Sequence, residues 1–99
     1  MAALTWQTGP QSLSLSGDLD RETLLPLWQQ RERLLADVKR MDVSQLQRVD
    51  SAGLAMLVHL RDQVSKRGSS LDICGITDRL RTLIELYNLQ EIIPVDTVS

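Results

Sequence analysis

The stretch V-D-S-A-G-L, residues 49–54, decides the fold, because two short polar residues separate an apolar strand end from a helix-forming run. Asp50 or Ser51 can accept hydrogen bonds from the N–H groups of a first helical turn, which have no partner within the helix. Gly53 has no side chain and therefore permits another segment to approach the backbone closely. The stretch predicts the start of a helix behind a strand.

The helix predicted after this start runs from Ala52 to about Arg67 and ends at Gly68. Its apolar sector is wide: Leu54, Leu57, Val58, Arg61 and Val64 hold one face, and Met56 and Leu60 extend that face. A helix that contacts only one sheet needs a narrower apolar stripe. We therefore expect two buried faces, with Met56 and Leu60 in a partner surface or packed under it.

Two segments near the N-terminus alternate apolar and polar residues, as half-buried strands do. They are residues 4–6 and residues 11–19, and the second places Leu13 and Leu15 on one face. Residues 7–11 carry the Gly-Pro pair of a turn. We expect an antiparallel hairpin at the edge of a sheet.

A helix is predicted over residues 24–36, where leucine and tryptophan side chains recur at helical spacing. Thr23 fits its N-cap, and Pro26 lies in the first turn, where the missing N–H costs little. A short strand is predicted at residues 38–43. Residues 44–50 then connect this strand to the central helix.

The C-terminal third predicts one more strand and one more helix. The strand covers residues 71–74, and we interpret Cys74 as a small buried core residue. Thr77 fits the N-cap of a helix with apolar residues at helical spacing, Leu80, Leu83, Ile84 and Tyr87. Asn88 fits a left-handed C-terminal position, and Leu89 then contacts the last turn as in a Schellman motif.

The predicted order is strand, strand, helix, strand, helix, strand, helix. Strands that alternate with helices require right-handed crossovers and a largely parallel sheet. The fold class is therefore α/β, with a mixed sheet, an N-terminal hairpin and helices packed on the sheet. We expect residues 1–99 to form a single domain, because a chain of this length has residues for one core only.

Composition narrows the classes of partner. A hydrophobic fraction of 42% with 24% charged residues is typical of globular domains. A formal charge of -2 gives no electrostatic attraction to nucleic acid or to an anionic membrane surface. No apolar run approaches the roughly 20 residues of a membrane span, and the first residues lack a signal-peptide pattern. We expect a cytoplasmic protein with no direct membrane insertion.

Candidate catalytic groups are few. His59 is the only histidine and has only Asp62 at ligand spacing, so we expect a partly exposed helix residue and no metal site. Three neighbouring carboxylates are better explained as caps and first-turn acids, Asp18, Asp20 and Glu22.

A thiol or hydrolytic enzyme that used Cys74 or His59 would need a base and an oxyanion site that the sequence does not show. We expect no catalytic residue, no cofactor and no small-molecule substrate.

The segment that opens the central helix is the best candidate site. A hydroxyl at an exposed helix N-terminus with small and apolar neighbours suits the centre of a protein-docking patch, and a phosphate on Ser51 would also be stable there. The expected partner-binding residues are Asp50, Ser51, Ala52, Gly53, Leu54, Ala55 and Met56. The alternative interpretation is a simple N-cap.

These residues resemble the signature of STAS domains, which occur in anti-sigma-factor antagonists and at the cytosolic end of sulfate transporters. The resemblance rests on D-S-A-G-L at 50–54, S-G-D-L-D at 16–20, Gly68 and I-C-G-I at 73–76. Within the family the chain most resembles the stand-alone STAS subunits of bacterial Mla phospholipid ABC transporters. The segments that carry this closer likeness are L-L-P-L-W at 24–28, G-L-A-M-L at 53–57 and L-Y-N-L at 86–89.

The resemblance implies a non-catalytic subunit that binds the ATP-binding-cassette ATPase of the transporter and supports its assembly and activity. Such a subunit is peripheral to the inner membrane and serves outer-membrane lipid asymmetry. The alternative is an anti-sigma-factor antagonist regulated by phosphorylation at Ser51. Antagonists of that kind usually show a second hydroxyl after the target serine, whereas this chain has Ala52.

Overall fold

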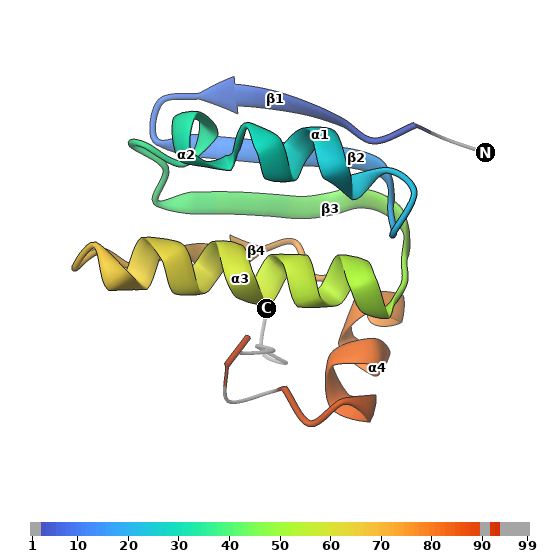
Figure 1. The fold of residues 1–99 in the computed structure, drawn as a ribbon. Helices are drawn as coiled ribbons and strands as arrows, with labels where there is room; N and C mark the ends of the chain where they lie inside the picture. Colours follow the sequence, from blue (N-terminus) through green and yellow to red (C-terminus); the bar gives the residue numbers. More distant parts are fainter. Residues whose placement is uncertain (1–2, 90–91, 94–99) are drawn as a thin grey trace.

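The computed structural model describes residues 3–89 and 92–93 and contains four strands and four helices in that part of the chain. In chain order the elements are β1 (Thr5–Gly9), β2 (Ser12–Leu19), α1 (Leu24–Gln29), α2 (Arg31–Leu34), β3 (Arg40–Val49), α3 (Ser51–Lys66), β4 (Asp72–Cys74) and α4 (Asp78–Leu86). The α/β class and the alternation of strands with helices are confirmed (Figure 1).

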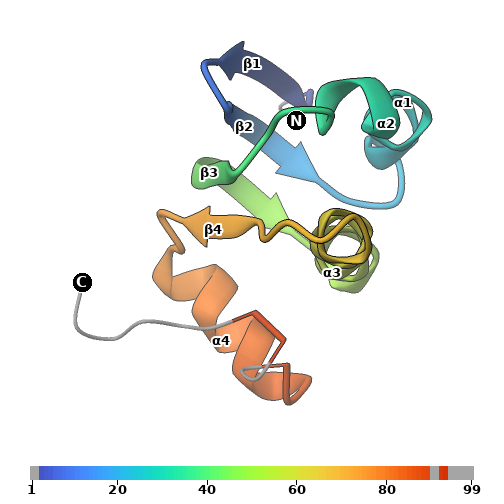
Figure 2. The same ribbon diagram turned by 90° about the vertical axis from the view of Figure 1, so that its left-hand side faces the viewer.

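The four strands form one mixed sheet in the order β1-β2-β3-β4. β1 pairs with β2 in antiparallel register, whereas β2 with β3 and β3 with β4 are parallel. The predicted N-terminal hairpin at the sheet edge is therefore confirmed. Figure 2 shows α1, α2 and α3 on one face of the sheet, and α4 beyond the β4 edge.

β3 is longer than the sequence predicted. Residues 44–49 continue the strand, whereas the sequence pattern indicated a connection there. The register shows why the alternation fails there. β2 advances from Ser14 to Ser16 while β3 advances from Asp42 to Gln45, so β3 contains an extra residue. A second shift of the same kind follows at Gly17. These irregularities interrupt the alternation of apolar and polar residues, so the sequence pattern did not indicate a strand over residues 44–49.

The single helix predicted over residues 24–36 is divided at Gln30 into α1 and α2. The break lies within five consecutive polar residues, 29–33, so no apolar side chain anchors this turn to the core. Thr23 does not cap α1 with its side chain. Its hydroxyl accepts from the N–H of Asp20 at 3.0 Å and donates to the carbonyl of Asp18 at 2.8 Å, so it closes the preceding turn.

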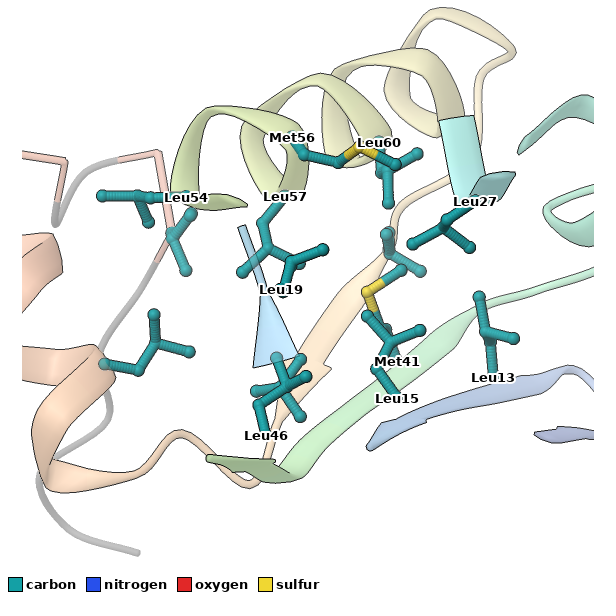
Figure 3. Close-up of a cluster of buried hydrophobic side chains, with 14 of the residues drawn as sticks. Leu13, Leu15, Leu19, Leu27, Met41, Leu46, Leu54, Met56, Leu57 and Leu60 are labelled. Carbon is teal, nitrogen blue, oxygen red and sulfur yellow. The ribbon is translucent and has the colours of Figure 1, made fainter. Parts of the chain in front are cut away.

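The main core lies between the sheet and α1 and α3. Leu13, Leu15 and Met41 project from the strands toward the fully buried Leu57 and Leu60 of α3 (Figure 3). Figure 3 also shows Met56 and Leu60 on the side of α3 that faces Leu27 of α1. The prediction of two buried faces on α3 is confirmed, since one face contacts the sheet and the other α1.

Other predictions at the C-terminal end have mixed outcomes. Asn88 has a φ of 57°, and the N–H of Leu89 donates to the carbonyl of Ile84 at 2.9 Å, which confirms the Schellman motif. Tyr87 lies just after α4 and is about half exposed. Cys74 is only half-buried, so its assignment to the core was wrong. Its side chain lies on the sheet face opposite α1–α3, because it alternates with Ile73, which lies in one row with the buried Leu13 and Met41.

Candidate functional site

The start of α3 is held by Asp50, the N-cap. Its backbone is extended, with φ -99° and ψ -174°, and its Oδ1 accepts from the N–H of Gly53 at 2.8 Å. Its Oδ2 accepts from the N–H of Arg21 at 3.4 Å, which ties the loop after β2 to the helix. The sequence left open whether Asp50 or Ser51 caps the helix, and the structure assigns this role to Asp50.

Gly53 sets the distance between α3 and the end of β2. A Cβ atom on Gly53 would overlap the carbonyl oxygen of Leu19 and would lie 2.9 Å from its carbonyl carbon. The N–H of Asp50 also donates to the Leu19 carbonyl, at 3.3 Å. Only glycine allows this close approach, so the expectation drawn from the sequence is confirmed and the first turn of α3 is fixed against the sheet.

Of the three neighbouring carboxylates in the sequence, Asp20 and Glu22 lie on the loop between β2 and α1, and Asp18 lies at the end of β2. Asp20 uses its Oδ1 to accept from the N–H groups of Glu22 and Thr23, at 2.9 and 3.1 Å, as the capping interpretation predicted. Glu22 is exposed, whereas Asp18 is buried with 5% of its surface accessible. These hydrogen bonds give Asp20 and Asp50 structural roles in a turn and a cap. The first turn of α1 contains no acidic residue, so the interpretation of Glu22 as a first-turn acid was wrong.

The seven predicted site residues are contiguous but do not share one surface. Ser51 and Ala55 are exposed, and Asp50 and Ala52 are half-buried. Gly53, Leu54 and Met56 are buried, so their assignment to a contact surface needs correction: they pack beneath the exposed side of the helix. The reason is the width of the apolar sector, since both Leu54 and Met56 point inward. No hydrogen bond joins the Ser51 hydroxyl to another of the described residues.

Trp28 on α1 packs partly against the core and is partly accessible at the surface. Its ring is half-buried, lies 5.8 Å from the His59 ring in an edge-on arrangement and is covered by the Arg31 guanidinium at 3.8 Å. The three-residue spacing of Trp28 and Arg31, within the single helix that the sequence predicts, is the signal that could have indicated this cation–π contact. Leu25, one turn earlier, is 54% exposed. Together these residues continue the exposed face of α3 onto α1.

The two residues weighed as catalytic groups are far apart in the fold. His59 lies on the outer side of α3, whereas Cys74 lies on the opposite face of the sheet, in a row with Gln7, Ser14 and Asp42. Burial raises the pKa of the Cys74 thiol, and the neighbouring Asp42 carboxylate raises it further. A protonated thiol is a poor nucleophile, and the sheet separates this thiol from the imidazole. The arrangement does not support a Cys-His catalytic pair.

Two other kinds of site are absent from residues 3–89 and 92–93. No group of three or more His, Cys, Asp or Glu side chains is placed to hold a metal ion there. None of the helices in the same part of the chain has the length and apolar character that a membrane span requires.

Comparison with known proteins assigns the family. A family model described as "Mlab, STAS domain" matches residues 2–94. The intermembrane phospholipid transport system binding protein MlaB of Escherichia coli (strain K12) is 42% identical over 87 residues, which cover 88% of this chain and 90% of the relative. An anti-sigma-B factor antagonist of Listeria monocytogenes is 30% identical over 91 residues, which cover 86% and 77%.

A solved structure shows the same fold. The crystal structure of an anti-sigma factor antagonist from Mycobacterium paratuberculosis superimposes with a TM-score of 0.75, at 20% identity, and covers 98% of this chain and 86% of that one. The predicted STAS-like arrangement, with its antiparallel edge strand, is thereby confirmed. The chain belongs to the STAS-domain family, in the group represented by the MlaB proteins.

Proposed function

We propose that this chain is a non-catalytic subunit of an ATP-binding-cassette phospholipid transporter and that it binds the transporter's ATPase subunit. The single observation that supports this most is the 42% identity to the Escherichia coli protein, whose name places it in an intermembrane phospholipid transport system. The antagonists are more distant, at 30% identity for the Listeria protein. The subunit would be peripheral to the cytoplasmic side of the inner membrane and serve outer-membrane lipid asymmetry.

The proposed docking surface is centred on the exposed residues of the first turns of α3, Ser51 and Ala55, with Ala52 between them. Small side chains let a partner approach this helix closely. The Asp50 cap and the Gly53 contact hold the helix end in one position. A standard interface buries about 800 Å² per partner, so this surface would need to extend onto α1, where Leu25 and Trp28 are accessible.

The test is coexpression of the chain with the ATPase subunit of the same transporter, followed by copurification and an affinity measurement. Wild type should form a stable complex. Ser51→Glu should bind at least tenfold more weakly, because docking would desolvate a charge that has no partner. Ser70→Glu provides the matched control, since Ser70 is an exposed serine between α3 and β4.

The same variant separates docking from folding. A negative charge at the N-terminus of α3 is favoured by the helix dipole by about 0.3–1 kcal/mol, so the melting temperature of Ser51→Glu should not fall. If Ser51→Glu binds the ATPase as tightly as wild type does, the docking surface lies elsewhere. If wild type forms no complex with the ATPase, the transporter function itself is wrong.

The second candidate is an anti-sigma-factor antagonist that is phosphorylated at Ser51. One observation favours it, because the Ser51 side chain is exposed at the N-terminus of a 16-residue helix, where a phosphate is electrostatically stable. Ala52 follows in place of a second hydroxyl. The test is to incubate the chain with an anti-sigma kinase from the same organism and to measure the mass of the intact chain, which shows whether a phosphate is added. Phosphorylation of the wild type that is absent in Ser51→Ala would support the antagonist function.

A further inference from the structure

An open groove of about 540 Å³ runs between α1–α2 and the C-terminal half of α3. One wall carries Trp28 and Arg31, and the other carries His59 and Lys66. Both walls lie on the same side of the sheet (Figures 1 and 2). Arg67 completes the groove at the end of α3. The groove therefore joins an aromatic ring to several cationic side chains.

The two guanidinium groups in the groove are oriented by backbone carbonyls. Arg31 donates from Nη1 to the carbonyl of Trp28 at 2.8 Å. Arg67 donates from Nη2 to the carbonyl of Leu35 at 2.6 Å and from Nη1 to that of Ala36 at 3.4 Å. A guanidinium has five N–H donors, so both groups keep unused donors in a fixed orientation.

Neither guanidinium has an acidic partner in the described part of the chain. No carboxylate of residues 3–89 and 92–93 lies within 4.0 Å of Arg31 or Arg67. Lys66 is already paired with Asp62 at 3.1 Å, and Glu32 is the other carboxylate that lines the groove. The groove thus has one net positive charge, although the whole chain has a formal charge of -2.

We propose that this groove binds an acidic segment of the partner protein, with carboxylates on Arg31 and Arg67 and an apolar side chain against Trp28. Guanidinium groups bind carboxylates through paired charge-assisted hydrogen bonds, which is why oriented arginines select carboxylates over neutral groups. The inference extends the docking surface of α3 and rests on the proposed function for the identity of the partner. The groove itself is tested without that partner.

The first experiment titrates the full chain with a 14-residue amphipathic peptide of Glu and Leu, and with the counterpart in which Lys replaces Glu. Trp28 fluorescence reports binding in a Trp6→Phe background. The Glu peptide should bind at least tenfold more tightly than the Lys peptide, and its affinity should fall as salt is added. Arg31→Glu and Arg67→Gln should each lower the affinity for the Glu peptide about tenfold or more. Arg67→Gln removes the positive charge and keeps a polar side chain at this position.

Arg33→Glu is the matched control, because Arg33 is an exposed arginine on α2 that lies outside the groove. Circular dichroism confirms that each variant is folded. Equal affinity for the two peptides, no binding of either peptide, or an unchanged affinity in Arg31→Glu would overturn the proposal. So would a preference for vesicles that contain phosphatidylglycerol, since that would make the groove a lipid site.

The second experiment repeats the variants with the coexpressed ATPase subunit and separates the two proposals. If Ser51→Glu abolishes the complex while the groove variants bind the ATPase and the Glu peptide as wild type does, only the groove proposal fails. If wild type binds the Glu peptide with the stated charge dependence but forms no complex with the ATPase, only the transporter function fails.

Discussion

α3 and α4 begin and end in the same way but occupy different positions in the core. Asp50 accepts from the N–H of Gly53 at 2.8 Å at the start of α3, and Thr77 accepts from the N–H of Leu80 at 3.2 Å at the start of α4. Each helix is followed by a residue with positive φ in a Schellman motif. The two helices therefore receive equivalent local signals at both ends.

Their burial differs. α3 buries six residues, on two sides, whereas α4 buries Leu80 and Ile84 on one side and is followed by the exposed Tyr87. Leu86 on α4 is 72% exposed. The comparison shows that caps determine where a helix begins and ends, while the width of its apolar sector determines how far it enters the core. Each of the following substitutions tests one side of this distinction.

The largest effect is expected for Met56→Glu, on the second buried face of α3. Met56 is 3% exposed, so the substitution places a carboxylate in the core without a partner. We expect a loss of about 3–5 kcal/mol in the free energy of unfolding, measured by urea titration. Ala55→Glu, at the exposed neighbouring position, should change it by less than about 0.5 kcal/mol. Equal stability of the two variants would show that α3 has only one buried face.

Gly53→Ala tests the close contact that α4 lacks. A methyl group there meets the Leu19 backbone, which must shift, so we expect a loss of about 1–3 kcal/mol despite the higher helix propensity of alanine. Ser65→Ala, at an exposed site on the same helix, should leave stability unchanged or slightly higher. A gain of stability in Gly53→Ala would mean that α3 can move away from β2.

Asp50→Ala and Thr77→Ala compare the two caps directly. Each substitution should lower the free energy of unfolding by about 0.5–2 kcal/mol, the usual range for a lost N-cap. Asp50→Ala should have the larger effect, because its carboxylate also accepts from the N–H of Arg21. Thermal unfolding of both variants under one buffer condition gives the comparison. A larger loss for Thr77→Ala would break the proposed ranking.

The smallest effect is expected for Leu86→Lys on α4. Because 72% of Leu86 is exposed, we expect a change within about 0.5 kcal/mol in the free energy of unfolding. The control is Ile84→Ala, a fully buried position on the same helix, which should lose about 2–5 kcal/mol. A loss above about 1 kcal/mol in Leu86→Lys would show that the outer side of α4 is covered in solution.

Local signals made much of this fold predictable from the sequence. The hairpin followed from alternation and the Gly-Pro turn, and the limits of α3 and α4 followed from capping residues such as Thr77 and Asn88. The requirement for glycine at position 53 also followed from its place in the sequence. Each of these features depends on neighbouring residues, so a sequence pattern contains the necessary information.

Features that depend on tertiary contacts were not predictable. The extra residues in β3 are visible only from its pairing with β2, and the break at Gln30 depends on which turns reach the core. The same holds for the candidate site. Its place at the start of α3 came from the sequence, and the apolar pattern already put Leu54 on the inner face of the helix. Whether Met56 lies in a partner surface or beneath it, and where Trp28 meets His59, depends on how α1 packs against α3.

The contact of Gly53 with the Leu19 carbonyl has a consequence for the entropy of association. The docking surface that we propose is built on a helix end fixed to the central sheet, so it is ordered before a partner arrives. Little ordering is then required on this side of an interface, and conformational entropy is lost mainly by the partner. Association would be limited by diffusion and orientation, at about 10⁵–10⁷ M⁻¹s⁻¹, without a preceding conformational step.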